Sequence, residues 1–354
     1  MTPRERVERT LRGELANKVP FTAFADRLPR SAASRRLRNG GLCLIDRQAS
    51  IFRVVTPNVH RQQIHYVEGG NTFVRTALET PAGTLDEVEQ YGPNGMTSWH
   101  VERFFKDPED YKPLLALIED QQYEPDYENF LQRQEQLGDD FFLRPDIGYS
   151  PMHTIVYSLM GIECFAREWA ERRDEVIELY DALVENHRSL YPIAAQSPAL
   201  MVNYCGNVSP EIVGLKRFEE YYLPHYDEFA DIMHAHDKLV SVHFDAATWL
   251  FEEFIGLSRI DCVEGFTPPP DGDMTVAQAR SVWHDKLLWI HFPPTAHLDP
   301  VAEIEDATRQ LLREAASGMR FLIGTAESLP EQNWQEALFA IMKIINTEGQ
   351  LPLT

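Results

Sequence analysis

Short apolar runs alternate with segments of helical periodicity through the second half of the chain, and this alternation limits the possible folds more than any other feature. Six such runs occupy residues 141–145, 199–204, 239–244, 260–264, 287–292 and 320–324. From residue 199 onward the runs are followed by helical segments at 209–236, 247–257, 275–284, 299–316 and 331–346. Repeated strand–helix units of this kind form parallel βαβ sheets, because each return to the sheet passes through a helix.

The number of expected strands favours a closed barrel. An apolar strand at 19–24 and one strand within 42–56 bring the total to eight. We therefore predict an α/β fold, a (β/α)8 TIM barrel that forms a single domain over residues 1–354. Neither GxGxxG nor GxxxxGK[ST] follows any of the expected strands, which argues against an open sheet that binds a dinucleotide or a nucleoside triphosphate.

The first half of the chain carries an added hairpin. Residues 60–67 and 72–79 each alternate in polarity, and Glu68-Gly69-Gly70-Asn71 separates them. This pattern predicts an N-terminal β-hairpin excursion from the barrel. Helices are expected at 2–13, 108–122, 125–137 and 173–196, with a broken helical pair around 151–170.

Charge and cysteine content limit the class of partner and the compartment. The net charge of −22 argues against nucleic acid or an anionic membrane surface as a partner. No run of 18 apolar residues occurs, and the amino-terminal residues contain no apolar region of a signal peptide. The four cysteines form no CxxC pair and are expected to be reduced thiols. We therefore expect a cytoplasmic protein.

The strand expected at 239–244 has the most informative alternation. Val240, Val242 and Phe244 share the face suited to packing under helices. The opposite face, which points into the barrel near its mouth, carries Ser241, His243 and Asp245. An imidazole and a carboxylate two residues apart suit a metal site or an acid–base pair. The alternative is a core histidine that has all its hydrogen bonds, beside an aspartate that caps the next helix.

Polar side chains also occur at the ends of the neighbouring strands. Glu264 and His291 end two of them, Asn203 and Tyr204 end an earlier one, and Glu327 follows the last. Barrel enzymes build their active sites at the carboxyl ends of the strands. We therefore predict that the catalytic residues are His243, Asp245, Asn203, Tyr204 and His291.

Four segments resemble a known family in their order and spacing. They lie at residues 4–20, 105–111, 209–226 and 238–245. Together they resemble the uroporphyrinogen decarboxylase superfamily, in particular its branch of corrinoid-linked methyltransferases, over almost the whole chain. The resemblance implies a (β/α)8 barrel, in agreement with the number of expected strands.

The resemblance also implies site residues. Porphyrinogen decarboxylases carry an arginine-rich stretch after the first strand, and here Arg27 and Arg30 stand in that region as expected substrate-binding residues. The methyltransferase branch holds zinc through a His-x-Cys pair, a later acid and a final cysteine. By position the expected metal ligands are His243, Asp245, Glu264 and Glu327. Carboxylate ligands in place of thiolates suit a metal site that acts on an oxygen or nitrogen substrate rather than on a thiol.

The function implied by the resemblance is methyl transfer between a small O- or N-methylated substrate and a corrinoid (cobalamin) carried by a partner protein, with zinc as a possible cofactor. A metal-free decarboxylase or lyase is the alternative, in which His243 and Asp245 move protons while Arg27 or Arg30 binds a substrate carboxylate. A third possibility is a ligand-binding or scaffold protein that kept the barrel and lost the chemistry.

Overall fold

The computed structural model describes residues 1–92, 95, 97–244, 247–325 and 329–353, which group into two compact units. Unit 1 comprises Met1–Ile51, Asp126–Gly148 and Ala195–Thr354, and unit 2 comprises Phe52–Pro125 and Tyr149–Ala194. The single domain expected from the sequence stays a prediction. Within the described residues, no helix has the length and apolar character needed to cross a membrane.

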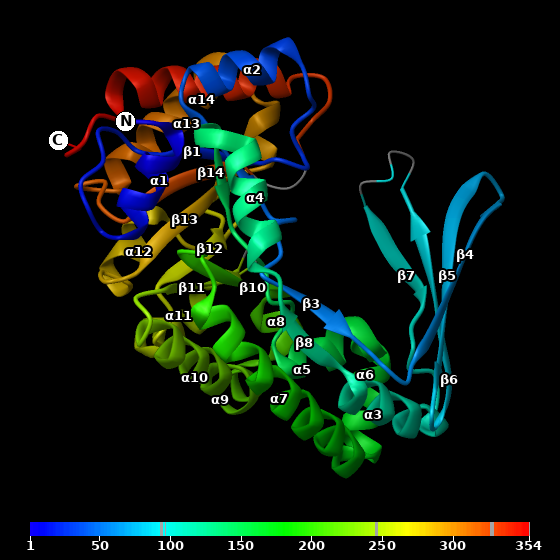
Figure 1. Ribbon diagram of the computed structural model, residues 1–354. Helices are drawn as coiled ribbons and strands as arrows, with labels where there is room; N and C mark the ends of the chain where they lie inside the picture. Colours follow the sequence, from blue (N-terminus) through cyan, green and yellow to red (C-terminus); the bar gives the residue numbers. More distant parts are fainter. Residues whose placement is uncertain (93–94, 96, 245–246, 326–328, 354) are drawn as a thin grey trace. The chain divides into compact units, whose positions relative to one another are not determined.

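Unit 1 contains a parallel, eight-stranded, curled sheet (Figure 1). Its strands, in spatial order, are β10 (Met201–Val208), β11 (Leu239–Phe244), β12 (Cys262–Phe266), β13 (Leu287–Phe292), β14 (Phe321–Thr325), β1 (Phe21–Phe24), β2 (Leu42–Asp46) and β9 (Phe141–Leu143). All described pairings in this sheet are parallel. The α/β class and the barrel-like parallel sheet expected from the sequence are therefore confirmed.

The two outer strands of this sheet are linked beyond the end of β9. Asp146 forms a parallel bridge with Asn203 of β10. The backbone N–H of Ile147 donates to Asn203 O at 3.0 Å, and that of Asn203 donates to Pro145 O at 3.0 Å. This link consists of one bridge rather than a regular ladder, so full closure of the barrel stays a prediction.

The strands are buried because both of their faces are covered. All residues of β1, β2, β12, β13 and β14 are buried. The inward positions form an apolar cluster that includes Cys43, Phe142 and Trp289, and α1 (Pro3–Leu11) adds Val7 and Leu11 to it. A continuous apolar run is the pattern expected of a strand that is covered on both sides.

The other helices of unit 1 surround the sheet (Figure 1). They are α2 (Ala32–Asn39), α4 (Tyr127–Leu137), α8 (Pro210–Val213), α9 (Leu215–Tyr221), α10 (Leu223–His234), α11 (Glu252–Leu257), α12 (Val276–Val282), α13 (Val301–Glu314) and α14 (Trp334–Glu348). The single helix expected at 209–236 is wrong, because α8, α9 and α10 replace it. Gly214 has a φ of 75°, which ends α8, and Pro224 lies at the start of α10.

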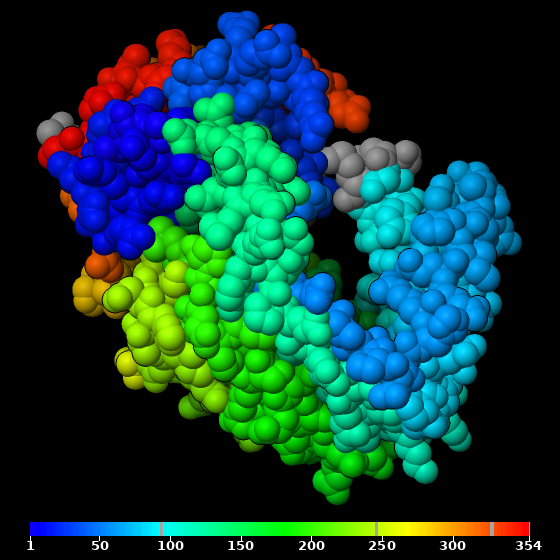
Figure 2. Space-filling model, viewed as in Figure 1, coloured from blue at the N-terminus to red at the C-terminus, as the bar shows by residue number. Residues whose placement is uncertain are grey.

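The two ends of the chain lie on the same side of unit 1 (Figure 2). The blue amino-terminal segment and the red carboxy-terminal segment form neighbouring parts of the surface in that view. Lys18 forms an antiparallel bridge with Gln350, and the N–H of Val19 donates to Gly349 O at 2.9 Å. These contacts tie the segment that precedes β1 to the segment that follows α14.

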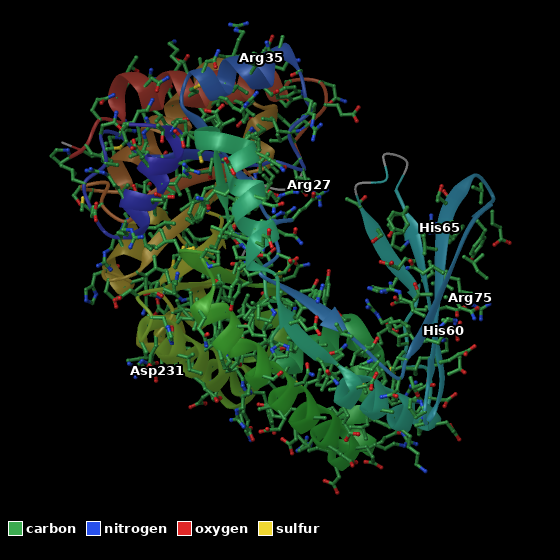
Figure 3. The ribbon with its side chains drawn as sticks, in the orientation of Figure 1. Arg27, Arg35, His60, His65, Arg75 and Asp231 are labelled. Carbon is green, nitrogen blue, oxygen red and sulfur yellow. The ribbon has the colours of Figure 1, made fainter. Side chains whose placement is uncertain are left out.

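Unit 2 consists of a four-stranded antiparallel sheet, a two-stranded sheet and helices. The larger sheet contains β4 (His60–Glu68), β5 (Asn71–Thr80), β6 (Gly83–Tyr91) and β7 (Ser98–Glu102) in this order. Figure 3 labels His60 and His65 on β4 and Arg75 on β5. The smaller sheet pairs β3 (Phe52–Val55) with β8 (Gln122–Pro125). The helical elements are α3 (Tyr111–Asp120), α5 (Pro151–His153), a π-helical turn (Thr154–Met160), α6 (Ile162–Glu171) and most of α7 (Arg173–Gln196).

The hairpin expected at 60–79 is confirmed and belongs to a larger sheet. Glu68 pairs with Asn71, so Gly69 and Gly70 form a two-residue turn. Their φ values are 56° and 84°, which is the region that a tight hairpin turn requires and that glycine adopts without steric cost. The other strands of this sheet, β6 and β7, were not expected.

The strand expected within 42–56 is in fact two strands in different units. Leu42–Asp46 is β2 of the parallel sheet, whereas Phe52–Val55 is β3 and pairs antiparallel with β8. The helices expected at 125–137 and 173–196 are confirmed as α4 and α7. A short 3₁₀ turn at Pro108–Asp110 precedes α3 and covers the start of the helix expected at 108–122.

His297 is a fully buried histidine in the short 3₁₀ helix Thr295–Leu298. Its ring packs against Phe292 with 5.0 Å between the ring centroids. Among the described residues, neither ring nitrogen has a hydrogen-bond partner. Burial lowers the pKa of His297 to about 4, although Asp271 opposes this shift. The ring is therefore neutral in the folded protein at neutral pH.

This burial predicts a pH dependence of stability. The folded-state pKa lies below the value of 6.5 for an unperturbed histidine, so the unfolded chain binds a proton more readily as the pH falls from 6.5 toward 4. Between pH 7 and pH 5, the wild type should lose about 2 kcal/mol more of its free energy of unfolding than the variant His297→Asn. Urea titrations at the two pH values measure this difference. Equal losses in both proteins would contradict it.

Candidate active site

The register of the parallel sheet brings His243 and Glu264 together. His243 of β11 is the direct Cα partner of Glu264 of β12. Both side chains lie on the inward side of their strands, because Leu239 and Cys262, at alternate positions of the same strands, pack in or against the inward apolar cluster. His291 occupies the corresponding inward position near the end of β13, and its ring centroid is 5.7 Å from that of His243.

Glu264 is the centre of a network of charged and imidazole groups. Its side chain has no exposed surface. Oε2 lies 2.6 Å from Nδ1 of His243. Oε1 lies 2.7 Å from Nη1 of Arg144 and 3.5 Å from Nε2 of His291. Arg144, which follows β9, is also fully buried, so the guanidinium and the carboxylate compensate each other's charge away from water.

The network keeps Glu264 ionised. Burial on its own would raise the pKa of this carboxyl group, but Arg144, His243 and His291 outweigh it and hold the pKa well below its usual range. For Arg144, burial would lower the pKa, but Glu264 and Asp146 raise it. At neutral pH the pair is therefore a guanidinium cation and a carboxylate anion, and this carboxylate fixes the orientation of the His243 ring.

A second carboxylate extends the network across the seam between β9 and β10. Asp146 Oδ1 lies 3.5 Å from Nη2 of Arg144 and accepts a hydrogen bond from Nδ2 of Asn203 at 2.9 Å. Asn203 Oδ1 in turn accepts from Oγ of Ser241 at 2.8 Å. Burial raises the pKa of Asp146, and this effect exceeds the opposing effects of Arg144 and Asn203. Polar groups from β10 and β11 are thus joined to Arg144.

Aromatic rings surround the guanidinium of Arg144. Its Cζ lies 5.6 Å from the ring centroid of Phe24 and 5.8 Å from that of Trp289. Phe24 also meets His291 edge to face at 5.5 Å. Trp289 is itself oriented by Thr22, whose Oγ1 accepts from Nε1 at 3.0 Å. Cation–π contacts with desolvated rings favour a buried arginine at this position.

Gly265 leaves the space that the ring of His243 occupies. Its φ is +80°, and a Cβ at this position would lie 2.6 Å from both Nδ1 and Cε1 of His243. Glycine is therefore required here both by the backbone conformation and by the close approach of the imidazole. Gly265 therefore helps to position the ring of His243, because it leaves room for the imidazole next to Glu264.

The structure brings together most of the residues expected at the strand ends. His243, Glu264 and His291 are in one network, and Asn203 joins it through Asp146. Tyr204 lies apart from this network, and the catalytic role expected for it stays a prediction. Its ring packs against Tyr226 and Phe229 of α10, with centroids 5.1 and 5.4 Å away, because it is on the opposite face of β10 from Asn203.

Arg27 and Arg30 lie in the loop between β1 and α2, and Figure 3 labels Arg27 there. Arg27 Nε is 3.3 Å from Oδ2 of Asp26. Arg30 is exposed and lines a pocket whose described walls include none of the residues of the Glu264 network. The substrate-binding role expected for both residues stays a prediction.

Two of the four expected metal ligands, Asp245 and Glu327, lie outside the described residues. Of the other two, Glu264 has Oε1 next to Arg144 and Oε2 next to Nδ1 of His243. Within the described part of the chain, no three His, Cys, Asp or Glu side chains are grouped so that they could hold a metal ion. The zinc site expected at these four residues therefore stays a prediction.

Sequence reasoning missed Arg144 and Asp146. Arg144 lies inside the run expected at 141–145 and Asp146 directly follows it, whereas in the structure both residues follow the end of β9 at Leu143. A guanidinium next to a prolyl residue in a connecting segment gives no periodic pattern, and only the curvature of the sheet brings this segment to Glu264. The position after the strand was the signal that could have identified them.

The fold and the network define a barrel-like α/β protein with a buried Arg–Glu–His centre at the carboxyl ends of its strands. Among solved structures, a methyltransferase from Methanosarcina mazei has a similar fold, with a TM-score of 0.60 over 98% of this chain and 98% of that chain. The two sequences are 12% identical, so the likeness concerns the fold. No family model matches the chain, and no curated protein matches it.

The buried ion pair predicts a large stability effect. Glu264→Gln removes the negative charge and leaves the Arg144 cation buried beside Asp146 alone, so the free energy of unfolding should fall by about 3–5 kcal/mol. Urea unfolding measures this change. As a control, Asp306→Asn breaks an exposed ion pair with Arg309 and should cost less than about 1 kcal/mol. Similar small losses in both variants would contradict the compensating role of Glu264.

The close approach of Gly265 to His243 predicts a second effect. Gly265→Ala adds one methyl group against the imidazole, whereas Gly69→Ala adds it at another positive φ with no atom within 4 Å. Both variants place a methyl group at a positive φ, but only that of Gly265→Ala meets another side chain, so Gly265→Ala should be less stable than Gly69→Ala by about 1–3 kcal/mol because of overpacking. Thermal and urea unfolding measure the difference. Equal destabilisation would show that the ring of His243 moves away without cost.

Proposed function

We propose that this protein is a methyltransferase of the corrinoid-linked type, which moves a methyl group between a small O- or N-methylated substrate and a corrinoid carried by a partner protein. The observation that carries the proposal is the ionised Glu264 that holds the imidazole of His243 at the carboxyl end of the sheet. The similar fold of the Methanosarcina mazei methyltransferase, over nearly the whole length of both chains, supports it.

In this proposal His243 transfers a proton to the heteroatom of the substrate. When the bond between the methyl carbon and oxygen or nitrogen breaks, the bonding electron pair stays on the heteroatom, which must then take up a proton. His243 contacts Glu264 through Nδ1, so we assign the proton transfer to Nε2. The corrinoid, when bound, supplies the cobalt centre that accepts or donates the methyl group.

Glu264 and Arg144 are positioning residues in this mechanism. The carboxylate of Glu264 favours the tautomer of His243 that carries its proton on Nδ1 and stabilises the imidazolium form. Arg144 keeps that carboxylate ionised in a site where burial opposes ionisation. Because both groups are buried, their effect on His243 is not weakened by solvent.

Zinc is a possible cofactor in this proposal, but the assigned steps do not require it. Glu264 is engaged with Arg144 and His243, so a metal site would have to be formed by His243 with Asp245 and Glu327. No step assigned to His243, Glu264 or Arg144 depends on such an ion.

We also infer that the sheet closes as a (β/α)8 barrel, with support from the hydrogen bonds that join residues 145–148 to β10.

A metal-free decarboxylase or lyase is the second candidate, and the burial of Arg144 next to two imidazoles favours it. A fully buried guanidinium that is charged at neutral pH can hold a substrate carboxylate, and an adjacent histidine can protonate the carbon from which carbon dioxide leaves. The two candidates differ in the bond that breaks, so their products distinguish them.

One assay separates these candidates. Purified protein is mixed with chemically reduced cobalamin and a panel of methyl ethers and methylamines, and methylcobalamin formation is followed by its visible absorption. We expect formation with at least one member of the panel. Release of carbon dioxide from small carboxylic acids without any methylcobalamin would support the lyase instead. A lack of both products over broad panels would contradict catalysis at this site.

The proposal makes a specific prediction for His243. His243→Ala should lower turnover by a factor of about 100 or more, because a general acid–base group is lost. The loss of stability should be only about 1–2 kcal/mol, because Glu264 keeps its ion pair with Arg144. The control His65→Ala removes an exposed histidine on β4 and should change neither quantity. Retention of most of the turnover by His243→Ala would rule out the assigned role.

A further inference from the structure

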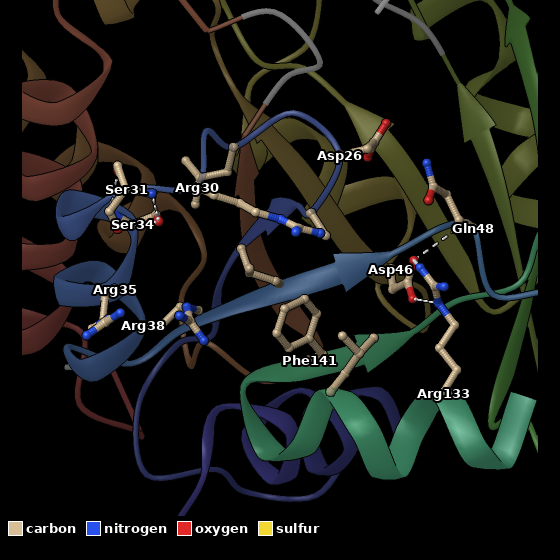
Figure 4. A pocket seen from close by; sticks show the side chains of 14 residues that line it. Asp26, Arg30, Ser31, Ser34, Arg35, Arg38, Asp46, Gln48, Arg133 and Phe141 are labelled. Atoms are coloured by element: carbon tan, nitrogen blue, oxygen red, sulfur yellow. Dashed lines mark hydrogen bonds and ion pairs between the residues drawn. The ribbon is translucent and has the colours of Figure 1, made fainter.

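A separate pocket lies on the outer face of β2, between α2 and α4 (Figure 4). Its volume is about 770 Å³. Leu44 and Asp46 line it, whereas Cys43 and Ile45 of the same strand belong to the inward apolar cluster. Because successive side chains of a strand point to opposite faces, this pocket is on the other side of β2 from the barrel interior.

The pocket has an unusual charge for this protein. Its ionisable lining residues are Asp26, Asp46, Arg30, Arg35, Arg38 and Arg133. The whole chain contains 55 acidic residues and 33 lysines and arginines. The chain as a whole is negatively charged and repels anions. The pocket lining, with twice as many arginines as carboxylates, has the opposite charge.

The two carboxylates of the pocket already have arginine partners, and for Asp46 this partner is the lining residue Arg133. Asp26 Oδ2 lies 2.8 Å from Nη2 of Arg47 and 3.3 Å from Nε of Arg27, neither of which lines the pocket. Asp46 forms an ion pair with Arg133, whose Nη2 donates to Oδ1 at 3.1 Å. Neither carboxylate is therefore left to balance a further cation of the lining.

The arginines at the α2 side of the pocket differ in their partners. Arg38 Nη1 lies 3.0 Å from Oδ2 of Asp140. Arg30 and Arg35 are exposed, and neither side chain has an ion-pair or hydrogen-bond partner within the described part of the chain. In Figure 4, Arg35 extends from α2, and Arg30 comes from the loop that precedes this helix. Two arginines thus line a pocket in which no described carboxylate is paired with them.

We propose that this pocket is a second binding site of the protein, for a small organic anion that carries a phosphate or several carboxylates. The guanidinium forks of Arg30 and Arg35 suit two-point hydrogen bonding to such groups. Leu28, Leu44, Leu137 and Phe141 provide an apolar wall for the body of the ligand. The volume is in the range of small-molecule sites. The proposal concerns residues outside the Glu264 network and does not depend on the function assigned to it.

Binding of three probes tests this proposal. Inorganic phosphate, phenyl phosphate and citrate are titrated into the full-length protein by isothermal titration calorimetry at about 0.15 M salt, where exposed charges are screened. We expect saturable binding of phenyl phosphate or citrate, tighter than that of inorganic phosphate because of the apolar wall. The double variant Arg30→Gln/Arg35→Gln should weaken it at least about tenfold, since each charged hydrogen bond contributes that much.

Arg36 offers a matched control on the same helix. Its guanidinium lies over the ring of Phe339, at 4.7 Å from the centroid, and it does not line the pocket. Arg36→Gln removes the same charge from α2 and should leave the affinity within about twofold of the wild type. An equal loss in the control, an unchanged affinity in the double variant, or no saturable binding of any probe would each overturn the proposal. Melting temperatures of the variants confirm that they are folded.

Discussion

The buried ion pair between Arg144 and Glu264 is the interaction on which the candidate site depends. A carboxylate at the end of β12 with no exposed surface could not stay ionised alone, and a guanidinium without a counter-charge could not be buried beside Phe24 and Trp289. Replacing such a pair with apolar residues often stabilises a fold. Its presence here, with His243 on the same carboxylate, therefore agrees better with a chemical role than with a purely structural one.

The sheet of unit 1 is divided along its strands into an apolar and a polar level. Cys43, Phe142 and Trp289 belong to the inward apolar cluster, to which α1 also contributes. Glu264 lies in the middle of β12 at the register of Trp289, and His243 lies next to the end of β11, so the polar groups begin at the level of Trp289 and continue toward the carboxyl ends of the strands. Such a division lets the apolar level carry stability while the polar level carries chemistry. Both proposed functions use the same polar level and differ only in the substrate bond that breaks.

Arginine has two different uses in unit 1. Arg144 is buried and charged, and it contacts the carboxylates of Glu264 and Asp146 and the ring of Phe24. Arg30 and Arg35 lie on the other side of β2 and meet no carboxylate among the described residues. Arg144 orients Glu264, a side chain of the protein itself. Arg30 and Arg35 keep their guanidinium groups available for hydrogen bonds to a ligand. In a chain with a net charge of −22, unpaired arginines in a pocket stand out.

The sequence by itself determined the parallel sheet, the hairpin turn at Gly69-Gly70 and the inward direction of His243 and Glu264, because these follow from periodicity and local backbone preference. It did not show that residues 42–56 contribute to two sheets, since both parts are short strands of similar composition. It grouped Tyr204 with Asn203 at one strand end, whereas the structure places the two side chains on opposite faces of β10. Arg144 was decided by tertiary structure alone. Its partner lies 120 residues away in sequence, and only the register and curvature of the sheet bring the guanidinium to Glu264.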